Sequence, residues 1–142
     1  MRTIAQLQLD DCRHIAGASE AMAQQQHAQV SIALCDGGGH LLLVQRLDGA
    51  SAASMEVAIA KARMAALNGK ATADQEAAIN GQRPALLQLA GVLGQPAVAM
   101  AGGLPLQVEG QCIGAIGVSG MTPELDGAIA AAGAAVLPTL IP

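Results

Sequence analysis

The chain has no aromatic side chain: its 142 residues include no Phe, Tyr or Trp, although 52% of them are hydrophobic. A core must therefore be built from Ala, Leu, Val, Ile and Met, with glycine allowing close backbone approach. Proteins that bind single-stranded nucleic acid stack the bases on aromatic rings. A net charge of −4 is also unsuited to binding phosphate backbones. We therefore expect no nucleic acid partner.

Long apolar runs and paired cysteines are also missing. No run approaches the roughly 20 apolar residues of a membrane-spanning helix, so we expect no membrane partner. The three cysteines have no C-x-x-C spacing, which is typical of buried free thiols in a reducing compartment. The first residues do not resemble a secretory signal, and a cytoplasmic location is expected. The length suits one domain over residues 1–142.

Hydrophobic spacing predicts four helices and five strands. The predicted helices are residues 10–26, 54–67, 72–79 and 123–137, and the predicted strands are residues 30–35, 40–46, 97–100, 104–108 and 111–118. Residues 80–94 are expected to form a loop with one turn near residues 84–89. Short strands linked mainly by hairpins favour an antiparallel sheet covered by helices. The predicted class is α+β, in the order α-β-β-α-α-β-β-β-α.

Two short segments carry local turn and cap signals. Asp36 and the three glycines that follow it suit a hairpin turn, because a strand and not a helix comes next. The phosphate-binding order Gly-x-x-x-x-Gly-Lys-Ser/Thr is absent there. Residues 72–75 have the spacing of a capping box, which predicts that Thr72 caps the short helix that follows.

The segment from residue 102 to residue 126 contains the most specific local pattern. A strand ends at Ser119-Gly120, and a helix begins with Thr122 as N-cap, Pro123 at the first position and Glu124 in the first turn. Unpaired amides and the helix dipole at such a turn suit a carboxylate or a phosphate. The predicted ligand-binding residues here are Ser119, Gly120, Met121 and Thr122.

Arg46 and Asp48 lie two residues apart at a strand end, where both side chains can point to the same side. One interpretation is an ion pair that holds the corner, and the other is a site where Arg46 binds an acidic ligand. Lys61 stands on an Ala-rich helix. It either extends along the surface to solvent or reaches the mouth of a pocket.

The histidines give no metal pattern, because His14, His27 and His40 match no common zinc spacing. His14 lies in the middle of the first predicted helix, beside its apolar stripe, where it can face a pocket or a partner subunit. No serine–histidine–acid set or nucleotide fingerprint is present in the sequence.

Three blocks of sequence together resemble one protein family. They are VSIALCDGGGHLLLVQRLDGA at residues 30–50, IAKARMAA at residues 59–66, and GGLP with IGAIGVSGMTPELD at residues 102–105 and 113–126. In content and order they are similar to the GlcG/HbpS-like family, also called the haem-degrading or haem-binding domain. The domain also occurs at the C-terminus of some corrinoid adenosyltransferases. The resemblance implies a profilin-like fold, a five-stranded antiparallel sheet between helices, and homo-oligomers from dimers to octamers.

The resemblance also implies haem as a ligand. In some members a threonine of a Ser-Gly-Gly-Thr turn is linked to haem, and the matching residue here is Thr122. In others a histidine of the first helix ligates the iron, for which His14 is the nearest candidate. This chain has Ser-Gly-Met-Thr in the turn, so Met121 either crowds the turn or offers a soft thioether.

Other members belong to catabolic operons for glycolate, diols or aromatic acids, which implies an alternative function. The protein would then be a small enzyme acting on a small carboxylate or carbonyl compound held by the Ser119-Gly120 turn, Thr122 and Arg46. Lys61, Glu124 or His14 would supply acid–base catalysis. A third interpretation is an accessory oligomer without a ligand.

Overall fold

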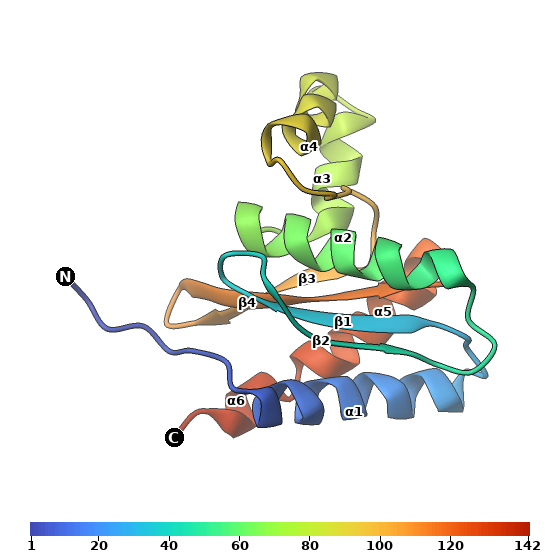
Figure 1. Ribbon diagram of the computed structural model, residues 1–142. Helices are drawn as coiled ribbons and strands as arrows, with labels where there is room; N and C mark the ends of the chain where they lie inside the picture. The colour runs from blue at the N-terminus through green and yellow to red at the C-terminus, as the bar shows by residue number, and fades with distance from the viewer.

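The computed structural model describes residues 1–142 and contains one antiparallel sheet with helices on both faces (Figure 1). The helices are α1 (Leu9–Gln25), α2 (Ala52–Asn68), α3 (Thr72–Ile79), the 3-10 helix η1 (Pro84–Gln88), α4 (Leu89–Val92), α5 (Pro123–Ala134) and α6 (Leu137–Leu140). The strands are β1 (Ser31–Asp36), β2 (Leu41–Arg46), β3 (Gly103–Val108) and β4 (Gln111–Ser119), in the order β2-β1-β4-β3. The predicted α+β class and the antiparallel pairing are confirmed.

The sheet has four strands and not the predicted five. Residues 97–100 do not join it: their one backbone hydrogen bond runs from the Val98 amide to the carbonyl of Ala60 on α2. They therefore pass over the helix layer, away from the sheet edge. A short apolar run by itself cannot distinguish a buried strand from a segment that packs on a helix. The outer edge of the sheet on this side is β3, whose Pro105 suits an edge strand.

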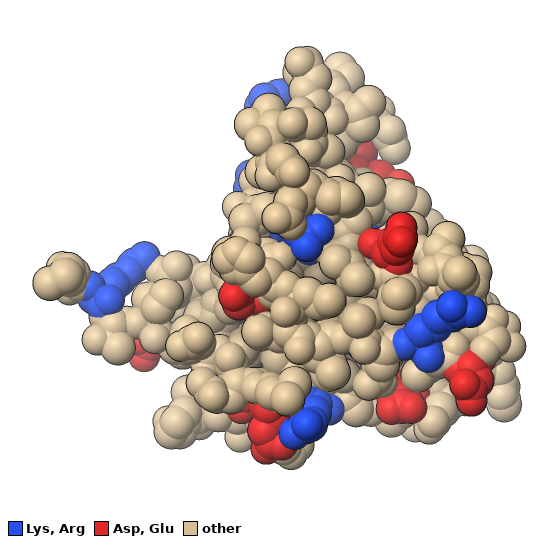
Figure 2. Space-filling model, viewed as in Figure 1, with Lys and Arg blue, Asp and Glu red and all other residues tan.

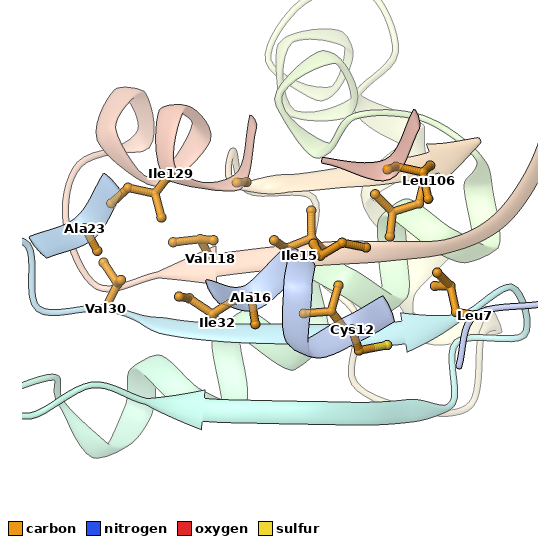
Figure 3. Close-up of a cluster of buried hydrophobic side chains, with 14 of the residues drawn as sticks. Leu7, Cys12, Ile15, Ala16, Ala23, Val30, Ile32, Leu106, Val118 and Ile129 are labelled. Atoms are coloured by element: carbon orange, nitrogen blue, oxygen red, sulfur yellow. The ribbon is translucent and has the colours of Figure 1, made fainter. Parts of the chain in front are cut away.

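The larger core lies between the sheet and the layer formed by α1 and α5 (Figure 3). Ile15 of α1, Ile32 of β1 and Ile129 of α5 are fully buried there. The two helices run antiparallel, since the Ser19 hydroxyl donates to the Ile129 carbonyl while the Ile15 carbonyl lies beside Gly133. With no aromatic ring available, branched aliphatic side chains fill this layer.

The opposite face packs on α2 through very small side chains. The cluster consists mainly of alanines from β1, β4 and α2, together with Cys35. Gly117 of β4 makes the close approach necessary, because a Cβ atom there would overlap the carbonyl of Ala58 and the amide of Ala62. The Ala-rich composition of α2 is thus the packing surface that lets a helix backbone lie directly on a strand.

Helices α3, η1 and α4 form an arm that projects from the α2 side of the molecule (Figure 1). The Thr72 hydroxyl attaches the arm by accepting from the Gly103 amide at 2.8 Å and donating to the Gly103 carbonyl at 3.3 Å. The predicted capping role of Thr72 is therefore wrong: Ala71 is the N-cap of α3, and Thr72 bonds across to the sheet. No residue of η1 or α4 is buried.

The β1–β2 turn forms as the sequence predicts. An Asp36 carboxylate oxygen accepts hydrogen bonds from the backbone amides of Gly38 and His40, both at 2.9 Å, and the His40 ring lies 3.2 Å away. Partial burial opposes ionisation of Asp36, but these hydrogen bonds outweigh it and lower the pKa of the carboxyl. The ionised Asp36 side chain therefore holds the turn.

Candidate functional site

The start of α5 has the cap that the sequence predicts. The Thr122 hydroxyl oxygen accepts a hydrogen bond from the Leu125 amide at 3.2 Å, and Pro123 occupies the first helical position. Glu124 lies in the first turn and is exposed. The Thr122 side chain is therefore engaged in holding the helix start.

Lys61 reaches beneath this helix start from α2 and is buried. Its Nζ donates to the Val118 carbonyl at 2.9 Å and lies 3.2 Å from Oδ2 of Asp126. The other carboxylate oxygen of Asp126 accepts from the Met121 amide at 2.9 Å. The expectation that Lys61 extends to solvent or to a pocket mouth is wrong, because only 2% of the residue is exposed. Its role as an acid or base stays a prediction.

These contacts explain what the turn binds within the chain itself. An anion does lie at the start of α5, and it is the carboxylate of Asp126 in the first turn of the helix. Sequence spacing gives no signal for its pairing with Lys61, because the two residues are 65 positions apart. The Met121 amide already donates to Asp126, so it is not free to bind an external carboxylate.

The turn itself is tightly constrained. Ser119 is buried and lies opposite Ser31 in the β1–β4 ladder. Gly120 has φ +141°, and a Cβ atom there would collide with the backbone of Gln29 and Val30. Met121 is 45% exposed. A residue exposed to this extent is not enclosed by the turn, and the availability of its thioether as a soft donor stays a prediction.

Arg46 and Asp48 lie at the same end of the sheet. Arg46 of β2 pairs with Ser31 of β1, on the side of β1 that faces away from β4. Gln29 lies close to both Gly49 and Gly120, through its side chain and its backbone respectively. Arg46 makes no ion pair with Asp48; its Nε donates to the Ala50 carbonyl at 2.9 Å. The ion-pair interpretation is therefore wrong, and a hydrogen bond to the backbone holds this corner.

The structure thus gathers six of the predicted site residues at one sheet end. These residues are Arg46, Asp48, Ser119, Gly120, Met121 and Thr122. The five main cavities of the surface are lined by other residues. Binding of a ligand at this corner stays a prediction.

His14 is separate from this corner. Because α1 and α5 are antiparallel, His14 lies toward the C-terminal part of α5, whereas Thr122 caps its beginning. The His14 side chain is 58% exposed, and its Nδ1 lies 2.8 Å from the Asp10 carbonyl. Because a carbonyl can only accept, that contact places a proton on Nδ1, and Nε2 makes no hydrogen bond within the chain. The structure does not bring His14 and Thr122 to one ligand.

No group of three or more His, Cys, Asp or Glu side chains is arranged to hold a metal ion. No helix combines the length and the apolar character needed to cross a bilayer. On the face shown in Figure 2, Lys and Arg side chains are scattered between broad uncharged areas.

Fold and sequence together define an α+β protein in which α2 covers one face of the sheet and α1 with α5 covers the other. The family model "Haem degrading protein HbpS-like" matches residues 7–135, and the chain belongs to this family. At family level it is thus related to haem-associated proteins.

Three relatives illustrate the similarity. Protein GlcG of Escherichia coli K12 is 38% identical over 105 residues, which are 74% of this chain and 75% of GlcG. The crystal structure of Klebsiella pneumoniae protein ORFY has a TM-score of 0.89 at 30% identity, covering 99% of this chain and 97% of that chain. The structure described as a PduOC:Heme complex has a TM-score of 0.82 at 28% identity, covering 92% and 94% of the two chains.

Proposed function

We propose that this protein binds haem and that His14 is the iron ligand. The observation that carries the proposal is the orientation of the imidazole: Nδ1 is engaged with a backbone carbonyl, and Nε2 is free. Histidines that bind metals commonly donate their other ring N–H to a carbonyl or carboxylate, which fixes the tautomer. Haem, when bound, would supply redox-active iron with an imidazole as axial ligand.

The surface around His14 suits a flat ligand. Gly17 and Ala21 follow at helical spacing on the same exposed side of α1, and a Cβ atom at Gly17 would meet nothing within 4 Å. Because these positions carry very small side chains or none, a planar ligand has room to approach the imidazole. Arg13 is exposed one residue before His14 and offers a guanidinium group for a propionate.

Haem binding at His14 is better supported than the alternative of a small-acid enzyme at the α5 turn. At that turn the Met121 amide and the Lys61 ammonium are both bonded to Asp126. Thr122 uses its hydroxyl as the helix cap. The name of the PduOC:Heme complex adds a structural relative in which haem is present.

A hemin titration of the purified protein tests the proposal. We expect a saturable Soret shift that His14→Ala weakens by at least about tenfold, since it removes the axial ligand. His27→Asn is the matched control, because His27 is exposed, has φ +52° and asparagine tolerates that conformation. Thr122→Ala should cost about 1 kcal/mol of stability and leave the Soret band unchanged. An unchanged titration in His14→Ala would contradict the proposal.

We further propose that the chain forms homo-oligomers, from dimers to octamers. Leu87 and Val92 on the arm are 71% and 79% exposed, and exposed apolar groups of this kind are typical of surfaces that contact another protein. Light scattering of the apo protein and of the hemin-saturated protein measures the assembly. A monomer in both conditions would contradict this proposal.

A further inference from the structure

A groove separates the projecting arm from α2. Its volume is about 340 Å³, and nine of its eleven lining residues are hydrophobic. Met64 of α2, Ile79 of α3, Leu86 of η1 and Met100 supply apolar walls. A volume of this size lies at the lower end of the usual range for small-molecule sites, about 300–1,000 Å³. The groove is large enough for a short apolar chain.

The side chains that border the groove carry a single charge, which is negative. Glu76 is its only charged residue, and no Lys or Arg lines it. One carboxylate oxygen of Glu76, Oε2, accepts from the Ala101 amide at 3.0 Å, while Oε1 makes no hydrogen bond within the chain. The carboxylate is therefore held in place at the groove with one oxygen available.

The backbone of residues 97–100 adds unpaired carbonyl groups and unpaired amides. These residues line the groove, and of their backbone groups only the Val98 amide is hydrogen-bonded within the chain. These four residues line the same groove as Glu76. This segment is the one that the sequence predicts as a fifth strand, and its unpaired backbone is a consequence of leaving the sheet.

We propose that this groove binds a small primary amine with a short apolar chain. An ammonium group carries three N–H donors, which match the free Glu76 oxygen and the neighbouring carbonyls. A carboxylate or phosphate would face the like charge of Glu76 with no Lys or Arg in the groove to offset it, so the groove disfavours the propionates of haem. A quaternary ammonium would need an aromatic cage, and the chain has no aromatic residue. The inference is independent of haem binding at His14.

Calorimetric titration with n-hexylammonium at pH 7 tests the proposal, with 1-hexanol and hexanoate as ligands of equal chain length. We expect the amine to bind and hexanoate not to bind. The alcohol should bind about tenfold more weakly than the amine, because it lacks the charge-assisted hydrogen bond. Glu76→Gln keeps an acceptor for the Ala101 amide and should weaken binding of the amine by a similar factor. Asp74→Asn, on the same helix but outside the groove, should have no effect.

Methyl NMR locates the bound amine. The Met64 and Met100 methyl signals should shift on titration, while those of Met22 and Met121, which lie outside the groove, should not. Ala90→Leu narrows the groove and should abolish amine binding. The proposal is overturned if hexanoate binds as well as the amine, or if Glu76→Gln binds normally. A third outcome would also overturn it. In that outcome light scattering shows that the amine dissociates an assembly of two copies, while the Met64 and Met100 methyl signals of the dissociated chain do not shift.

Discussion

The Lys61 ammonium and the Asp126 carboxylate form a buried ion pair, 3.2 Å apart, between α2 and α5. The helices lie on opposite faces of the sheet, so the pair connects the two helix layers past the end of β4. The side chains are only 3% and 5% exposed. Each also makes a backbone hydrogen bond, to the Val118 carbonyl and from the Met121 amide. The pair thereby fixes the turn that connects β4 to α5.

Removal of one partner of this pair should destabilise the protein strongly. Lys61→Met leaves the Asp126 carboxylate buried without its cation, and breaking a buried pair in this way costs about 3–5 kcal/mol. The double variant Lys61→Met/Asp126→Leu removes both charges and should recover part of that loss. Urea unfolding of Lys61→Met, of Asp126→Leu and of the double variant measures the coupling energy between the two charges. Additive losses would show that the two charges do not interact.

Gly117 should not tolerate any side chain. Gly117→Ala places a methyl group against the Ala58 carbonyl and should destabilise the protein by about 1–3 kcal/mol through overpacking of α2 on β4. Gly127→Ala is the matched control, because a Cβ atom at that position in α5 would meet nothing within 4 Å. The control should stabilise by up to about 1 kcal/mol through helix propensity. Equal effects in the two variants would contradict the proposed close approach.

Features encoded within a few residues were predictable from the sequence. Thr122 and Pro123 specify the start of α5 through adjacent cap signals, and Asp36 with its glycines specifies the β1–β2 turn. The period of the apolar residues likewise located α1 and α2 to within two residues at each end.

Features that depend on the tertiary arrangement were not predictable. Thr72 has the local spacing of a cap, yet its hydroxyl finds a better pair of partners on Gly103 once the chain is folded. Residues 97–100 read as a strand because apolarity does not specify which layer they join. The partner of Lys61 is remote in sequence, so only the fold reveals it.

The β1–β2 turn should weaken in acid. The lowered pKa of Asp36 means that the folded state favours the carboxylate, so this contribution to stability is present above the ordinary pKa of 3.8 and is lost as the pH falls through the lower folded value. Asp36→Asn should therefore lower the melting temperature at pH 7 and have a smaller effect at pH 2–3. Asp74→Asn, at an exposed position, is the control. A difference that stays constant with pH would contradict the role of the charge.

The cysteines should differ in reactivity, with a consequence for the iron ligand. Burial raises the pKa of the Cys12 thiol to about 11 and that of the Cys35 thiol to about 12. Both remain protonated and enclosed at pH 7, so Cys12, although on the same helix as His14, offers no thiolate to iron. Cys112 is only partly buried. Ellman's reagent at pH 7 should therefore modify one thiol per chain rapidly, and Cys112→Ser should remove that phase. A rapid reaction of Cys12 would contradict its enclosure and make Cys12 a second candidate iron ligand on α1. Hemin titrations of Cys12→Ala and His14→Ala would then distinguish the two ligands.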